Sequence, residues 1–185
     1  MGRTARNAGY SATVELESAG PYSPSRAYQT ERPTNETADV FEKRIWREHM
    51  HVDERGELYI PAMAFKNALV SAAKYRNEKI PGQRNKTFTG KFTSGVQIIQ
   101  DIKLGIKAAG VPGEELYLNA DGVRGSAHRV WRTYPKVEKW SATVVFDVCD
   151  PIVSEEVFVE TLRDAGNFIG VGRFRPENRG FYGRF

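Results

Sequence analysis

The amino-acid sequence predicts a single α+β domain across its 185 residues. Two segments alternate apolar and polar residues in the manner of half-buried strands, one near each end of the chain. A segment with apolar residues at helical spacing comes after each of them. This order is typical of an antiparallel sheet that carries its helices on one face.

The first strand is expected over residues 10–17, where every second residue is apolar. A loop rich in proline comes next. Asn35 is then expected to cap a helix over residues 37–50, which carries an apolar stripe. A short strand is expected over residues 58–60.

Pro61 ends this short strand, and its fixed φ suits the first position of a helix. The next helix is therefore expected over residues 62–76, where apolar residues recur at helical spacing. Residues 96–106 alternate again and predict a strand or a bent pair of strands. Residues 116–118 predict one more short strand.

The strongest alternation lies in residues 140–148, which are expected to form a central strand. Ser154 can cap a helix that runs to Ala165, and Gly166 suits the C′ position after it. The simplest fold with this order is a ferredoxin-like (RRM-like) βαββαβ domain. RNA-recognition folds of this type use the open sheet face or its edges for bases.

The last twenty residues, 166–185, combine five glycines, four arginines and five aromatic residues. Glycine allows a close approach of the backbone, arginine binds phosphate with a planar fork, and aromatic rings stack on unpaired bases. We interpret this stretch as a loop that holds single-stranded nucleic acid. The alternative is a glycine-rich turn with an edge strand whose aromatic residues belong to the core. The candidate binding residues are Gly170, Gly172, Arg173, Phe174, Arg175, Arg179, Gly180 and Tyr182.

The formal net charge is only +4, so the distribution of the charges matters more than their sum. Residues 74–91 and 122–139 are both strongly basic, whereas residues 31–57 lean acidic. The two basic stretches and the C-terminus could converge on one face that binds a polyanion, or they could be separate solvated loops. The candidate residues in these stretches are Lys86, Lys91, Arg124, Arg129, Trp131 and Arg132.

Two of the other candidates leave alternatives open. Trp131 lies among basic residues where a base could stack, yet it could equally be a core residue. Lys66 lies near the start of the 62–76 helix, where the free amides could help it to bind a phosphate. An exposed helix lysine is the plain alternative.

Other functional classes receive little support from the sequence. Cys149 is the only cysteine, so a disulfide within the chain and a cysteine-based zinc site are excluded, and we expect it in the core. His49 and His51 do not share a helix face, which argues against a zinc site with Asp53. No P-loop, dinucleotide fingerprint or apolar span long enough for a membrane is present. We therefore expect no cofactor, no metal and a cytoplasmic location.

Two motifs resemble those of a known family. Ile60-Pro-Ala-Met-Ala-Phe-Lys-Asn-Ala-Leu69 resembles the signature I-P-G-S-S-L-K-G-A-L of the RAMP superfamily, the repeat-associated mysterious proteins of CRISPR effector complexes. Residues 170–183 look like the glycine-rich loop of the same superfamily, and the order of the two motifs agrees. The sequence departs from the pattern at Ala62 and Asn67, where the family has glycine.

The resemblance implies an antiviral ribonucleoprotein and is closest to the backbone subunit, which assembles in several copies along a guide RNA. It implies a palm and a protruding thumb or finger, for which residues 77–95 and 122–139 of the single 1–185 domain are the candidates. Its expected partners are single-stranded guide RNA, a complementary target nucleic acid, further copies of the chain and other effector subunits.

The favoured hypothesis is therefore a non-catalytic subunit that binds single-stranded RNA. The alternative within the superfamily is a metal-independent endoribonuclease, in which His128 or His49 would act as general acid–base or Asp39 would support cleavage. A third hypothesis is a structural subunit that contacts only proteins.

Overall fold

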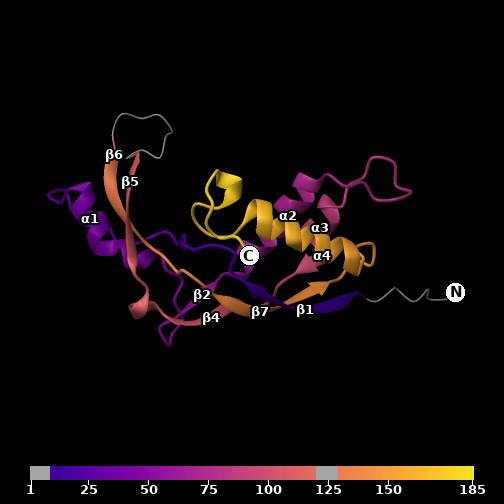
Figure 1. Ribbon diagram of the computed structural model, residues 1–185, viewed down its shortest axis with the longest axis horizontal. Helices are drawn as coiled ribbons and strands as arrows, with labels where there is room; N and C mark the ends of the chain where they lie inside the picture. The colour runs from indigo at the N-terminus through magenta and orange to yellow at the C-terminus, as the bar shows by residue number, and fades with distance from the viewer. Residues whose placement is uncertain (1–8, 120–128) are drawn as a thin grey trace.

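The computed structural model describes residues 9–119 and 129–185 (Figure 1). Its strands pair antiparallel into a three-stranded sheet in the order β1-β7-β3 and into two strand pairs, β2-β4 and β5-β6. The strands are β1 (Tyr10–Glu17), β2 (Glu57–Ile60), β3 (Val96–Gln97), β4 (Ile102–Lys107), β5 (Gly113–Asn119), β6 (Arg129–Pro135) and β7 (Ser141–Val148). The α-helices are α1 (Ala38–Ile45), α2 (Ala62–Arg76), α3 (Thr89–Gly95) and α4 (Glu155–Asp164).

Strand β7 is the centre of the three-stranded sheet, as its alternation predicts. It pairs along its whole length with β1, from Tyr10 opposite Val148 to Glu17 opposite Ser141. Its other edge pairs with β3 only at Asp147 and Val148. The inward residues of β7 are buried, whereas the residues between them face the open side of the sheet.

Helices α2 and α4 cover one face of this sheet (Figure 1). Phe65 and Leu69 of α2 and Phe158 and Leu162 of α4 are buried in one common core with β7. The rings of Phe146 and Phe158 meet edge to face with 5.2 Å between their centroids. The protein therefore has the predicted α+β class, with antiparallel strands and with helices on one face of the sheet.

Several helix boundaries differ from the expectation. Thr37, and not Asn35, is the N-cap residue of α1, which passes into a 3₁₀ turn over Trp46–His49. Pro61 precedes α2 as its N-cap residue and is not its first residue. Helix α3 was missed within residues 77–95, because its sequence is rich in glycine and hydroxyl residues and carries few strong helix formers.

The end of α4 also differs. The chain continues after α4 into a π-helical turn over Ala165–Ile169, so Gly166 lies inside this turn and not at a C′ position. Residues 170–185 contain a 3₁₀ turn over Pro176–Asn178 and no strand. The last strand of a βαββαβ order is thus replaced by an irregular segment, which packs on the helical side of the sheet (Figure 1).

Strands β5 and β6 form a two-stranded hairpin that projects from the sheet (Figure 1). The register pairs Gly113 with Pro135 at the base and Asn119 with Arg129 at the far end of the described strands. Helix α1 packs beside β6. The segment 122–139 therefore contributes β6 to this hairpin, whereas 77–95 forms a loop followed by α3. Whether either segment is a thumb or finger insertion stays a prediction.

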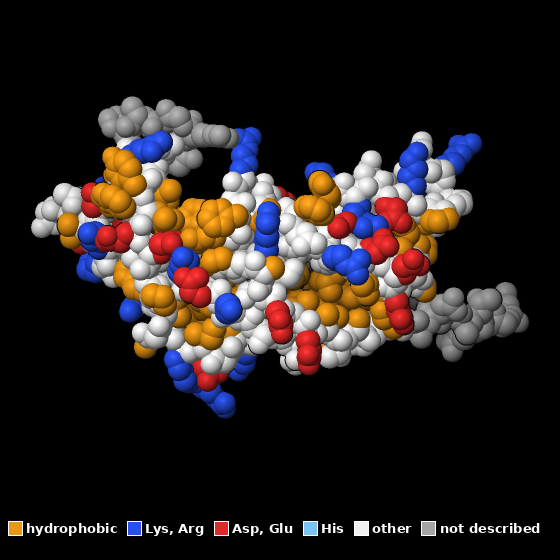
Figure 2. Space-filling model, in the orientation of Figure 1, with side chains coloured by type: hydrophobic (Ala, Val, Ile, Leu, Met, Phe, Trp, Pro, Cys, Tyr) orange, Lys and Arg blue, Asp and Glu red, His pale blue; other side chains and the backbone are white. Residues whose placement is uncertain are grey.

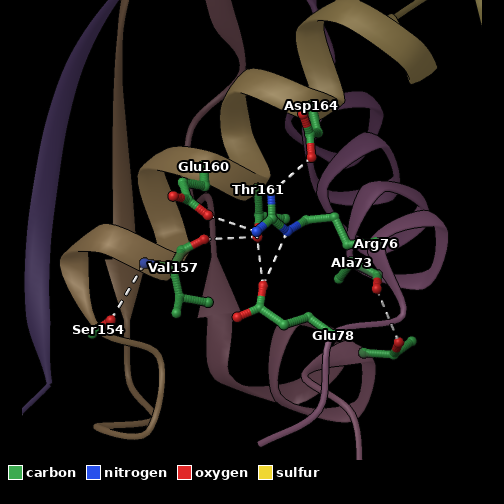
Figure 3. A network of polar contacts seen from close by, with 9 residues as sticks. Ala73, Arg76, Glu78, Ser154, Val157, Glu160, Thr161 and Asp164 are labelled. Carbon is green, nitrogen blue, oxygen red and sulfur yellow. Dashed lines mark hydrogen bonds and ion pairs between the residues drawn. The ribbon is translucent and has the colours of Figure 1, made fainter.

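An ion-pair network joins the end of α2 to α4 (Figure 3). The guanidinium group of Arg76 contacts three carboxylates, with 2.8 Å to Glu78, 2.6 Å to Glu160 and 2.7 Å to Asp164. The hydrogen bonds that Arg76 donates to Glu78, Asp164 and Glu160 raise its pKa despite its partial burial. Ser154 caps α4 by accepting a hydrogen bond from the Val157 N–H, as the sequence predicts.

Replacing Arg76 with methionine should lower the free energy of unfolding by about 1–3 kcal/mol, because three carboxylates lose their shared donor. Urea denaturation of the two proteins measures this difference. Arg163→Met, at an exposed position of α4, is the matched control and should change the midpoint little. Equal effects of the two substitutions would show that the network does not stabilise the α2–α4 contact.

Candidate nucleic-acid interface

The glycine-rich C-terminal segment is fixed to the rest of the protein by backbone hydrogen bonds. The Ala19 N–H donates to the Arg184 carbonyl at 2.9 Å, and the Gly183 N–H donates to the Pro21 carbonyl at 2.6 Å. The Arg173 N–H donates to the Ser23 carbonyl at 2.7 Å. Residues 170–185 therefore form an ordered loop that lies against residues 19–23.

Two glycines make this close approach possible. Gly172 has φ near +78°, and a Cβ atom there would lie 2.5 Å from the Ser23 carbonyl oxygen. A Cβ atom on Gly180 would lie 1.8 Å from the Phe174 carbonyl oxygen. These glycines are therefore required for packing of the protein on itself, and they hold the loop in one shape.

The loop and the start of α2 enclose a cleft of about 220 Å³. Gly170, Gly172 and Arg175 line one side of the cleft, and Met63 and Asn67 of α2 line the other. The two motifs that resemble the RAMP superfamily are about 100 residues apart in sequence, yet the fold places them on opposite walls of the same cleft. This meeting was not predictable from either motif alone.

Arg175 is the cation of this cleft. Its guanidinium group lies 2.9 Å from Glu177 and donates to the Gly172 carbonyl at 3.2 Å. The Arg175 side chain remains about one-third exposed, so it can reach solvent and a ligand in the cleft. A phosphate could take the place of the Glu177 carboxylate, because both accept two hydrogen bonds from the planar fork.

His51 also lines the cleft, although no motif in the sequence marks it as an RNA-binding residue. Its ring packs against Tyr59 at 5.5 Å. Burial lowers the pKa of His51, and the positive charge of Arg26 lowers it further, whereas Asp101 opposes the shift. The imidazole is therefore neutral at pH 7, where it offers one donor and one acceptor rather than a positive charge.

Three residues of the loop, Arg173, Phe174 and Tyr182, pack on the base of the hairpin. The guanidinium group of Arg173 lies over the Tyr134 ring at 4.6 Å, and Phe174 meets the same ring edge to face at 5.3 Å. The Tyr182 hydroxyl donates to the Glu114 carboxylate at 2.6 Å. Burial and this neighbouring carboxylate raise the pKa of Tyr182. Arg173, Phe174 and Tyr182 therefore link the loop to the hairpin, while Arg179 is exposed.

The hairpin presents an aromatic surface of its own. Trp131 is 51% exposed and lies 5.2 Å from its cross-strand neighbour Tyr117. Arg129 shares this face and approaches the Tyr117 ring at 6.0 Å. Figure 2 shows hydrophobic, Lys and Arg side chains gathered over the hairpin. Trp131 is thus a surface residue and not a core residue.

Arg132 lies on the opposite face of β6, since it follows Trp131 by one residue. Its guanidinium group is 3.7 Å from the Glu42 carboxylate. Arg124 and His128 lie outside the described residues. The loop between α2 and α3, which carries the exposed Lys86, lies at the opposite end of the molecule from the hairpin (Figure 1). The described parts of the two basic stretches therefore lie at opposite ends of the molecule.

Two candidate lysines already have partners within the protein. The Lys66 ammonium donates to the Phe92 carbonyl at 2.7 Å and also to the Val96 carbonyl, and burial lowers its pKa. The first amide of α2, at Ala62, donates to the Asp101 carboxylate at 2.9 Å. Lys66 thus holds the end of α3 and does not point to a free helix terminus.

Lys91 forms an ion pair with Asp150 at 2.9 Å, next to the junction of α3 and β3. The hydrogen bond that Lys91 donates to Asp150 is the main cause of the lowered pKa of Asp150. Lys91 therefore has a structural partner, whereas Lys86 has its side chain in solvent.

The structure describes two of the three catalytic candidates, His49 and Asp39. His49 is 5% exposed, and its Nδ1 lies 2.9 Å from the Arg26 carbonyl. Tyr28 and Tyr134 flank its ring. Asp39 lies in the first turn of α1. His49 thus belongs to the packing of α1 and its 3₁₀ turn against the hairpin.

Three further findings concern metal binding, membrane spans and the single cysteine of the described residues. They contain no group of three His, Cys, Asp or Glu side chains that could hold a metal ion. None of their helices is both long and apolar enough to cross a membrane. Cys149 is exposed just after β7, so the expectation of a core cysteine was wrong, because the burial of alternate residues ends with the strand.

The open face of the β1–β7 sheet carries hydroxyl groups and carboxylates. Its outward side chains are Ser11, Thr13, Glu15, Glu17, Ser141, Thr143, Val145 and Asp147. These two strands present no Lys, Arg or aromatic side chain on this face. The candidate residues that remain accessible lie on the helical side of the sheet and on the hairpin instead.

Comparison with known proteins agrees with this architecture. No protein-family model matches the sequence, and no curated protein matches it. Among solved structures, the crystal structure of Cmr6 from Pyrococcus furiosus aligns with a TM-score of 0.50 at 14% sequence identity. The alignment covers 95% of this chain and 97% of Cmr6. The chain has a Cmr6-like fold. The likeness extends over the whole domain and shows the fold alone.

The Lys91–Asp150 ion pair predicts a dependence of stability on pH. The pKa of Asp150 is lower in the folded than in the unfolded state, so its contribution is fully present above its ordinary value near 4 and is lost as the pH falls through the folded pKa. Asp150→Asn should therefore flatten the decline of the unfolding midpoint between about pH 5 and pH 3. An unchanged acid dependence would contradict this assignment.

The Tyr182–Glu114 hydrogen bond predicts that Tyr182→Phe lowers the free energy of unfolding by about 1–3 kcal/mol, because the partly buried, charged Glu114 carboxylate loses a hydrogen bond. Thermal or urea unfolding measures the effect. Tyr75→Phe, which removes the hydroxyl of an exposed tyrosine, is the matched control. If both variants unfolded like the parent protein, the hydroxyl would not tie the loop to the hairpin.

Proposed function

We propose that this protein is an RNA-binding subunit of a CRISPR-like ribonucleoprotein and that it holds single-stranded RNA across its glycine-rich loop. The observation that carries the proposal is the cleft in which this loop meets the start of α2. The two motifs that resemble the RAMP superfamily both contribute residues to this cleft. The fold shared with Cmr6, itself a RAMP-like protein, supports the same assignment.

The accessible arginines of the loop supply the affinity for phosphate. Arg175 faces the cleft, and Arg179 and Arg184 are exposed on the outer side of the loop. Binding of phosphate to Arg175 requires that the RNA displace the Glu177 carboxylate. Because such contacts release counterions from the RNA, the affinity falls as the salt concentration rises.

The hairpin is the second contact surface of this proposal. Tyr117 and Trp131 offer two exposed rings, and Arg129 adds a positive charge beside them. Rings of this kind stack on unpaired bases of any sequence, so the binding is largely independent of sequence. The base of the hairpin contacts the loop through Tyr182, so the two surfaces are held in one relative position.

The finer parts of the proposal follow from the resemblance of the two motifs to the RAMP superfamily. The subunit carries a guide RNA, acts in the cytoplasm, meets a complementary target nucleic acid and assembles with copies of itself and with other effector subunits. It is non-catalytic in this proposal. The burial of His49 and its contacts with Arg26 and Tyr134 support a structural role for that histidine rather than a role in cleavage.

The proposal is tested by replacing Arg175 and Arg179 with glutamine together. Fluorescence anisotropy with a labelled oligouridylate should show weaker binding, and the slope of log K against log salt should become less steep by about 1.4, because two phosphate contacts are lost. The matched control is Lys103→Gln with Lys107→Gln on β4, which removes the same charge far from the loop.

Unchanged affinity in the arginine variant, or equal losses in both double variants, would contradict a specific role of the loop. The ratio of absorbance at 260 and 280 nm of the purified protein is an independent measurement, since a guide-binding subunit retains cellular RNA. Protein free of nucleic acid that also fails to bind the oligouridylate would overturn the proposed function.

A further inference from the structure

Two large aromatic side chains lie side by side on the surface beyond the cleft. Tyr75 is 62% exposed and Phe168 is 49% exposed. Their ring centroids are 5.4 Å apart, and the ring planes differ by 33°. Single exposed aromatic residues are common, but a contacting pair places a continuous flat apolar surface in water.

The backbone brings this pair together from distant parts of the chain. Tyr75 lies in the last turn of α2, and Phe168 lies in the π-helical turn that follows α4. Within that turn, Ala165 and Ile169 are buried while Phe168 faces outwards. An insertion of this kind into a helix changes the direction of the next side chains, and π-turns are frequent at functional sites.

The two rings lie on segments of the chain that lead into the cleft. Asn67 lines the cleft, and positions 67, 71 and 75 follow one another at intervals of four residues along one side of α2. Eight residues of α-helix span about 12 Å, so Tyr75 lies about that far from Asn67 along the helix axis. On the other side, Phe168 precedes Gly170 of the cleft by two residues. A strand that left the cleft along α2 would therefore pass close to both rings.

The carboxylates beside the rings favour contact with a neutral base over contact with a phosphate. Tyr75 borders a shallow depression that it shares with Arg76, Glu78 and Asp164. Arg76 already forms ion pairs with these two carboxylates and with Glu160 (Figure 3). Its guanidinium group is therefore not available to a phosphate. The three carboxylates outnumber this one cation, so the net charge here is negative. A phosphate is repelled at such a site, whereas the neutral face of a base can stack there.

We infer that Tyr75 and Phe168 form a stacking site for one unpaired base of the RNA that leaves the cleft along α2. This inference rests on the proposed function, because it extends the path of the same ligand. It assigns the cleft to the phosphate backbone through Arg175 and the aromatic pair to a base. The two kinds of contact therefore respond differently to salt.

The test is Tyr75→Ala with Phe168→Ala, measured by anisotropy with the labelled oligouridylate and with an oligoadenylate of equal length. Stacking is worth about 1–3 kcal/mol per base, so the dissociation constant should rise about 5- to 150-fold. The slope of log K against log salt should stay that of the parent protein, because no phosphate contact is lost. Tyr75→Phe with Phe168→Tyr keeps both rings and should retain the parent affinity.

A scan with abasic nucleotides gives a readout that a loss of folding would not produce. One position of the RNA should weaken binding to the parent protein when its base is removed, and the same removal should have no further effect in the alanine variant. Ile99→Ala removes an exposed apolar side chain from the other side of the sheet and is the control for surface truncation.

Three results would overturn the inference while the proposed function stands: parent-like affinity of the alanine variant, a reduced salt slope in that variant, or additive effects of the abasic site and the alanine substitutions. Loss of self-association without loss of RNA affinity would identify the pair as a protein contact and would also overturn it. Failure of the parent protein to bind either RNA would overturn the proposed function itself.

Discussion

The close backbone approach between the C-terminal segment and residues 19–23 is the constraint on which the candidate site depends. Three backbone hydrogen bonds of 2.6–2.9 Å form this contact, and side chains at Gly172 or Gly180 would collide with carbonyl oxygens. Because the loop cannot move away without breaking these bonds, the backbone that carries its arginines is held in place. The shape of the cleft beside α2 follows from the same contact.

This constraint extends to the hairpin through aromatic packing. Tyr134 of β6 lies between the Arg173 guanidinium group and the Phe174 ring, and Tyr182 binds Glu114 of β5. The loop therefore joins the helical side of the sheet to the hairpin. Accessible arginines and exposed rings lie on these elements, while the open sheet face carries carboxylates and hydroxyl groups. In the proposed function, this separation of charge favours the loop and the hairpin over the sheet face as the surface for a polyanion.

The elements with a strong local pattern were predicted well. Strands β1 and β7 and helices α2 and α4 each show a clear period of apolar residues, and this period reports which face of an element is buried. Helix α3 and the π-helical turn were missed, since their formation depends on burial of Phe92 and Ile169 in the common core and not on local propensity. The exposed pair of Tyr75 and Phe168 was missed for the same reason, because nothing in the sequence places these two residues in contact.

What the sequence by itself determined is the elements with a strong apolar period and the chemical types gathered in the last twenty residues, since both depend on local order along the chain. Only the tertiary structure decided which cations and rings are accessible. Lys66 binds carbonyls about 26 and 30 residues away, Lys91 binds a carboxylate 59 residues away, and Arg76 binds carboxylates more than 80 residues away. A basic side chain looks the same in sequence whether it meets such a partner or solvent, and the fold alone brings the partner to it.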